Sequence, residues 1–252
     1  TALPVRSPSS SFPDGHRSMT AWSSAVLDEL ASSFEHARDG ERATQMAAYM
    51  RNQFPFFGIA AADRRRLVGQ ALRAAGSGPH RAVPDEADLT EFARACYERR
   101  EREFHYAAVN LLRRRLRTLT PASMPLLHDL ITTQSWWDTV DEIAAHLVGG
   151  VVRAHPELVS LMDAWVESDN LWVARSAVLH QLMYKDQTDP ERLFAYCLAR
   201  ADEPDFFYRK AIGWALRQYA RTDPEAVAAF CTQHRHALSP LSYREATKHL
   251  DV

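Results

Sequence analysis

The sequence predicts an all-α fold in which helical hairpins repeat along the chain and stack as a solenoid. Apolar residues recur at helical spacing throughout, and no stretch alternates apolar and polar residues convincingly as a half-buried strand would. Prolines recur at a nearly constant interval, at Pro121, Pro156, Pro190 and Pro224. A period of about 34 residues in a helical sequence is typical of stacked hairpins, whose concave face can bind a long partner.

The first half of the chain contains five segments with helical spacing of apolar residues. They are residues 25–38, 42–54, 63–75, 88–100 and 103–117. Residues 1–20 are rich in proline and serine instead, so we expect a flexible tail there. A single domain is expected over residues 21–252.

In the second half, each of the four prolines opens a short helical segment. Each follows a potential helix cap, namely Thr120, His155, Asp189 or Asp223. Longer helices are expected between these segments, at residues 135–149, 170–184 and 205–220. Cys197 and Cys231 also lie one repeat apart, which predicts that both are packing residues.

Composition and motifs exclude several classes of protein. No stretch approaches the length of a membrane span, and the three cysteines form no CxxC pair, so we expect a reducing, cytoplasmic setting without membrane contact. Nucleotide-binding loops, zinc-protease motifs and serine-hydrolase motifs are absent, and the histidines lack metal-ligand spacing. We therefore expect no metal and no cofactor.

Nearly all of the basic residues are arginines, and the exceptions are Lys185, Lys210 and Lys248. Arginine suits bidentate contacts with phosphate, although a GC-rich genome would produce the same bias. The net charge of −2 does not favour binding to nucleic acid. Such binding would therefore depend on local clusters of cations.

The expected helix that begins at Ser135 carries aromatic and acidic residues on two faces. Ser135 and Asp138 have the spacing of a capping box, and Trp136 falls on the apolar stripe that predicts the core. Trp137 and Asp141 lie one turn apart on another face. A carboxylate beside an indole off the core stripe could stabilise a developing cation.

Two later helices also place aromatic and cationic residues off their core stripes. Lys210, Trp214 and Arg217 share one face of the helix expected at 205–220, and Arg175 follows Trp172 by one turn. This pattern is typical of a surface along a phosphate backbone. The alternative for each residue taken singly is ordinary packing or a solvated surface.

Five motifs together resemble the AlkD-like DNA alkylation repair glycosylases, which have a HEAT-like repeat fold. They are "AYMRNQFPFFGI", "SWWDTVDEI", "SDNLWVARSAVL", "FFYRKAIGWALRQYARTDP" and "LSYREATKHL", in a likeness that runs from about residue 22 to the C-terminus. The resemblance implies a monofunctional DNA glycosylase that hydrolyses the N-glycosidic bond of cationic N3- or N7-alkylated purines for base excision repair. It also implies a basic concave groove that holds double-stranded DNA without flipping the base.

The resemblance implies roles for individual residues. Asp141 matches the catalytic aspartate, Trp137 and Trp214 match tryptophans at the deoxyribose, and Arg175 matches an arginine beside the backbone of the lesion. Tyr49, Arg51 and Arg217 match positions of DNA contact, and Lys210 is expected to contact DNA because it shares a helix face with Trp214 and Arg217. We expect a monomer that works in the cytoplasm at the bacterial nucleoid. The alternative is a non-catalytic helical scaffold that binds DNA or a protein partner.

The sequence departs from the family pattern at Ala60 and Ala62, where a polar residue and a proline are expected. Small side chains there would leave space beside the duplex. Our hypothesis is therefore that the groove accepts adducts bulkier than methyl, as do related glycosylases that protect producers of DNA-alkylating antibiotics.

Overall fold

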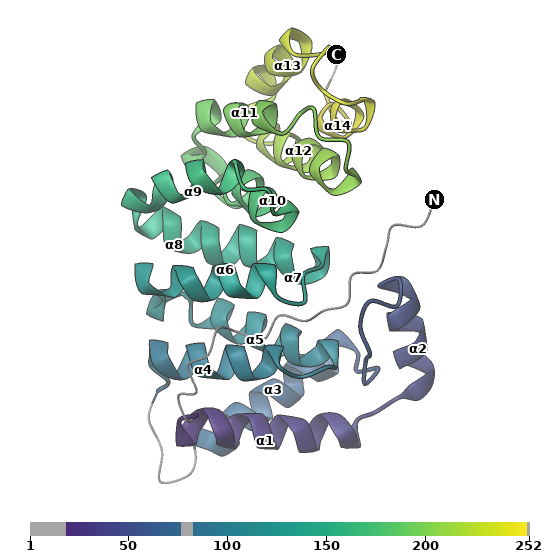
Figure 1. The fold of residues 1–252 in the computed structure, drawn as a ribbon, viewed down its shortest axis with the longest axis vertical. Coiled ribbons are helices and arrows are strands. Elements are labelled where there is room, and N and C mark those ends of the chain that lie inside the picture. The colour runs from purple at the N-terminus through teal and green to yellow at the C-terminus, as the bar shows by residue number, and fades with distance from the viewer. Residues whose placement is uncertain (1–18, 77–82, 251–252) are drawn as a thin grey trace. The chain divides into compact units, whose positions relative to one another are not determined.

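A computed structural model describes residues 19–76 and 83–250, and these parts of the chain are helical with no strand (Figure 1). The all-α prediction is therefore confirmed. Residues 1–18 of the expected tail lie outside the described residues, and only its last two positions, 19 and 20, are described. By contacts, the chain divides into two compact units, Thr1–Gln134 and Ser135–Val252.

The first unit contains six α-helices in its described part. They are α1 (Ala21–His36), α2 (Gly40–Tyr49), α3 (Ala61–Gly76), α4 (Glu86–Tyr97), α5 (Arg102–Arg114) and α6 (Met124–Thr132). Helix α1 packs on α3 and α4, and α4 packs on α5 and α6. The apolar faces meet in a core that includes Leu30, Phe34 and Phe92. The five helices expected in the first half of the sequence are all present.

The second unit continues the pattern of helical hairpins. Its elements are α7 (Trp137–Glu142), a π-helical segment (Ile143–Val148), α8 (Gly149–Ala154), α9 (Val159–Val166), α10 (Leu171–Leu179), α11 (Pro190–Ala199), α12 (Phe206–Tyr219), α13 (Pro224–Gln233) and α14 (Pro240–Ala246). Helix α10 packs on both α9 and α12, and α12 packs on α14 (Figure 1). The chain has a helical-repeat fold, as predicted.

The recurring prolines begin helical turns as the sequence predicts. Pro190 and Pro224 begin α11 and α13, where the side chains of Asp189 and Asp223 accept hydrogen bonds from backbone N–H groups at 3.0 Å and 2.9 Å. Thr120 caps the 3₁₀ turn that leads into α6. The prediction that His155 caps a helix is wrong, because its side chain makes no capping hydrogen bond. Its Nδ1 lies 3.3 Å from the Glu157 carboxylate instead.

Several helix boundaries differ from the predictions, among them the following three. The helix expected at 170–184 ends at Leu179, because the Gln181 side-chain amide pairs with both the N–H and the carbonyl of Asp189, at 2.7 Å and 3.2 Å. The helix expected at 42–54 ends at Tyr49, since two residues soon after it have positive φ angles. The helix expected from Ser135 begins at Trp137, so the predicted Ser135 cap is wrong.

Cys197 and Cys231 are confirmed as packing residues. Cys96, Cys197 and Cys231 are all buried and carry free thiols. Burial raises the pKa of the Cys231 thiol to about 11, so this sulfur is protonated at neutral pH. In the part of the chain that the structure describes, no helix is long and apolar enough to cross a membrane.

Candidate DNA-binding and catalytic site

The centre of the candidate site is an ion pair between Asp141 of α7 and Arg175 of α10. Arg175 Nε donates to Asp141 Oδ1 at 2.8 Å, and Nη2 donates to Oδ2 at 2.9 Å. The third nitrogen, Nη1, donates to the backbone carbonyl of Phe207 in α12. This forked arrangement fixes the plane of the carboxylate and joins three helices of the repeat.

The ion pair is largely shielded from solvent, since the side chains of Asp141 and Arg175 are 13% and 4% exposed. Burial raises the pKa of the Asp141 carboxyl, and the charge and hydrogen bonds of Arg175 oppose that rise. The nearby carboxylates of Asp138 and Glu142 raise it further. Together these effects leave the pKa of Asp141 raised, and Arg175 is the main group that favours its ionised form.

Arg175 was expected beside a DNA phosphate, and that contact stays a prediction. Arg175 as a whole is only 3% exposed, and each of its three guanidinium nitrogens donates a hydrogen bond within the protein. In this structure its role is to hold Asp141.

An aromatic cluster lies next to the ion pair. Trp136, Trp172 and Phe207 have ring centroids 5.0 to 5.9 Å apart, and the Arg175 guanidinium lies 5.9 Å from the Phe207 ring centroid. Trp136 was expected on the core stripe, but it is half-buried at the N-cap of α7. The three rings lie about one repeat apart in sequence, and this spacing is the signal that could have predicted the cluster.

The predicted residues of α12 share one face of that helix. Lys210, Trp214 and Arg217 follow each other at i+4 and i+3, and all three are half-buried. Both cations bind one carboxylate: Glu245 of α14 lies 3.1 Å from Lys210 Nζ and 2.5 Å from Arg217 Nη1. Sequence reasoning missed Glu245, because nothing local links it to α12.

The predicted contacts in the first unit are exposed. Tyr49, at the end of α2, is 72% exposed, and Arg51 is exposed with a φ of 55°. The segment after them is held by the buried Glu103 of α5, whose carboxylate accepts hydrogen bonds from three backbone N–H groups at 2.9 to 3.1 Å. Ala60 follows directly and is half-buried, whereas Ala62 is exposed in the first turn of α3.

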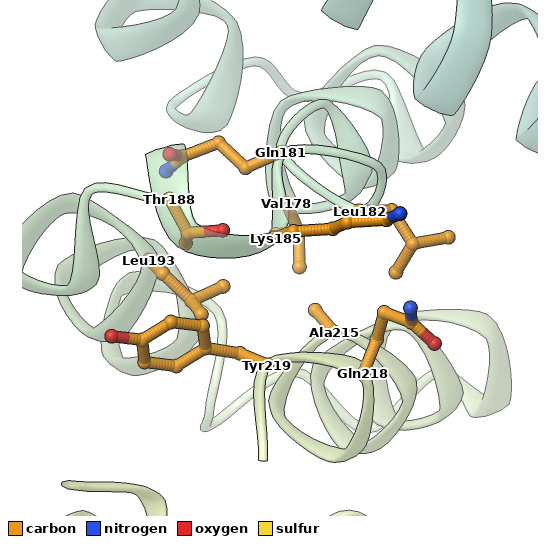
Figure 2. Close-up of a pocket in the computed structure, with 9 residues that line it drawn as sticks. All are labelled: Val178, Gln181, Leu182, Lys185, Thr188, Leu193, Ala215, Gln218 and Tyr219. Carbon is orange, nitrogen blue, oxygen red and sulfur yellow. The ribbon is translucent and has the colours of Figure 1, made fainter. Parts of the chain in front are cut away.

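One small pocket lies between α10, α11 and α12, and Figure 2 shows side chains from all three around it. Its volume of about 10 Å³ holds about one water, which is too small for a nucleobase. None of the predicted site residues lines it. Within residues 19–76 and 83–250, no group of three or more His, Cys, Asp or Glu side chains could hold a metal ion.

Comparisons with known proteins point to one family. Residues 30–250 match the family model described as "DNA alkylation repair enzyme". Among solved structures, the chain is similar to a predicted DNA alkylation repair enzyme from Enterococcus faecalis, with 31% identity and a TM-score of 0.76, over 85% of this chain and 97% of that one. A search of curated proteins gave no significant match.

Proposed function

Because the chain belongs to the DNA alkylation repair enzyme family, we propose that it is a monofunctional DNA glycosylase that releases cationic N3- or N7-alkylated purines from duplex DNA. The observation that carries the proposal is the largely shielded Asp141 carboxylate, which Arg175 orients and which lies one helical turn after Trp137 in α7. Double-stranded DNA at the nucleoid is the partner, and the enzyme works as a monomer.

The chemistry of the substrate matches this arrangement. An alkylated purine with a positive charge leaves as a neutral base when its bond to C1′ breaks, so no acid is needed for the leaving group. Positive charge develops on the deoxyribose in the transition state, where an ionised carboxylate lowers its energy. Asp141 then accepts a proton from the water whose oxygen bonds to C1′.

The remaining residues stabilise the cation or hold the duplex. The indoles of Trp137 and Trp214 flank the sugar and each contribute about 0.5–2 kcal/mol of cation–π attraction. Lys210 and Arg217 of the second unit contact the DNA backbone, and so do Tyr49 and Arg51 of the first. Since the carboxylate and indoles act at the sugar, the base can remain in the helix during the reaction.

The proposal is tested by purine release from a duplex that contains N7-methylguanine, under single-turnover conditions. Wild-type protein is expected to release the base, and Asp141→Asn is expected to lose at least about 100-fold in rate, as when a charge that stabilises a transition state is removed. The control is Glu142→Gln, which removes the same charge from the neighbouring residue and should keep near wild-type activity.

The thermal midpoint of each variant must be measured beside its rate, because Asp141→Asn leaves Arg175 buried without its carboxylate partner. A folded Asp141→Asn protein with full activity would refute the assignment. If wild-type protein binds duplex DNA but releases neither N7-methylguanine nor a bulky N3-adenine adduct, the non-catalytic scaffold is the correct function.

The preference for bulky adducts is tested at Ala60, whose small side chain is half-buried before α3. Ala60→Gln is expected to slow release of a bulky N3-adenine adduct while release of N7-methylguanine stays unchanged, because the longer side chain fills the space beside the duplex. Equal release of the bulky adduct by wild type and variant would show that Ala60 does not set the size limit.

A further inference from the structure

Glu245 binds the two cations of the α12 face that the proposed function assigns to DNA contact. Its two carboxylate oxygens bind Lys210 and Arg217, which lie on either side of Trp214 along the helix. These ion pairs are only partly screened from solvent, because the three charged side chains are 19 to 36% exposed. The carboxylate is thus within reach of a ligand that competes for the same cations.

The position of Glu245 is built into the packing of α12 and α14. A Cβ on Gly213 would lie 2.5 Å from Glu245 Cβ and 3.0 Å from the Ser242 carbonyl oxygen, so only glycine allows α14 to approach this closely. Ser242 Oγ also donates to the Arg209 carbonyl at 3.0 Å. The stem of Glu245 is therefore held against α12 next to the two cations.

We propose that Glu245 is an internal substitute for a DNA phosphate, which weakens binding to undamaged duplex by occupying Lys210 and Arg217. A phosphate must displace the carboxylate, at least from one cation, before it can bind there. Because every phosphate in a duplex competes in the same way, the effect lowers sequence-independent affinity, and it makes Glu245 a determinant of specificity for lesions. The inference rests on the proposed function, since it takes these cations as DNA contacts.

The test compares wild type with Glu245→Gln for binding to undamaged duplex DNA over a range of salt concentrations. The variant is expected to bind more tightly, with a log–log salt slope steeper by about 0.9 for one additional phosphate contact. Excision of N7-methylguanine by the variant should also be inhibited at lower concentrations of undamaged competitor DNA.

The matched control is Glu203→Gln, which removes the same charge from an ion pair with Arg200 at 3.1 Å. Its salt slope should stay that of wild type. In an Arg217→Met background, Glu245→Gln should change the slope less than it does alone. An equal change in the Glu203→Gln control, or an unchanged slope for a folded Glu245→Gln protein, would overturn the inference.

These outcomes separate the inference from the proposed function. If wild type excises the lesion and Glu245→Gln binds undamaged DNA no more tightly, the inference fails alone. If wild type neither binds DNA nor excises the lesion, the proposed function fails and the inference fails with it.

Discussion

The Asp141 side chain experiences two opposing influences that decide its charge. Burial favours the neutral acid, whereas the guanidinium of Arg175 favours the carboxylate through its charge and two hydrogen bonds. The proposed chemistry needs the carboxylate, so activity should depend on Arg175 even if that residue never touches DNA.

This balance predicts a change in pH dependence when Arg175 is replaced. Arg175→Met removes the group that lowers the Asp141 pKa, so that pKa should rise further and a smaller fraction of Asp141 should be ionised at a given acidic pH. The acid limb of the release rate should therefore move to higher pH, by about one unit or more. The measurement is the single-turnover release rate of N7-methylguanine against pH, at saturating protein.

Arg175→Lys provides the comparison, because it keeps the positive charge but loses the fork that binds both oxygens. Its acid limb should lie between those of wild type and Arg175→Met. An Arg175→Met protein that must be added at a higher concentration to saturate the DNA, but keeps the wild-type acid limb, would show instead that Arg175 binds phosphate and does not control Asp141.

At the scale of elements, the contact between α12 and α14 depends on Gly213. The Cβ of Gly213→Ala would collide with Glu245 Cβ at 2.5 Å, so we expect the two helices to separate and the free energy of unfolding to fall by about 1–3 kcal/mol. Gly69→Ala in α3 is the control. Its Cβ would meet only the end of the flexible Arg73 side chain, at 3.4 Å, so stability should rise by about 0.5–1 kcal/mol. Urea denaturation measures both, and equal stability of the two variants would contradict this packing.

The sequence predicted the helices well where local interactions define them. Helices α11 and α13 begin at their prolines because the preceding aspartates cap them within three residues. The end of α10 could not be predicted, since Gln181 stops the helix by pairing with Asp189 in the next hairpin. Asp141 and Arg175 were identified by resemblance, but their pairing across 34 residues appears only in the folded chain.

At the scale of the whole molecule, a net charge of −2 gives no overall attraction to DNA, so binding must come from local cations. Arg51 in the first unit and Arg217 in the second are the candidates to compare. If a duplex contacts both units, Arg51→Met should lower the log–log salt slope by about 0.9. Arg217→Met should lower it by up to about 0.9, because Glu245 competes for Arg217, and the double variant should lower it by about the sum.

The control for this additivity is Arg38→Met, because Arg38 is not among the proposed DNA contacts and the variant should leave the salt slope unchanged. A slope that falls only in Arg217→Met would confine the DNA surface to the second unit. Salt-independent binding by all variants would argue against a phosphate-led surface altogether, and therefore against a groove that holds the duplex through its backbone.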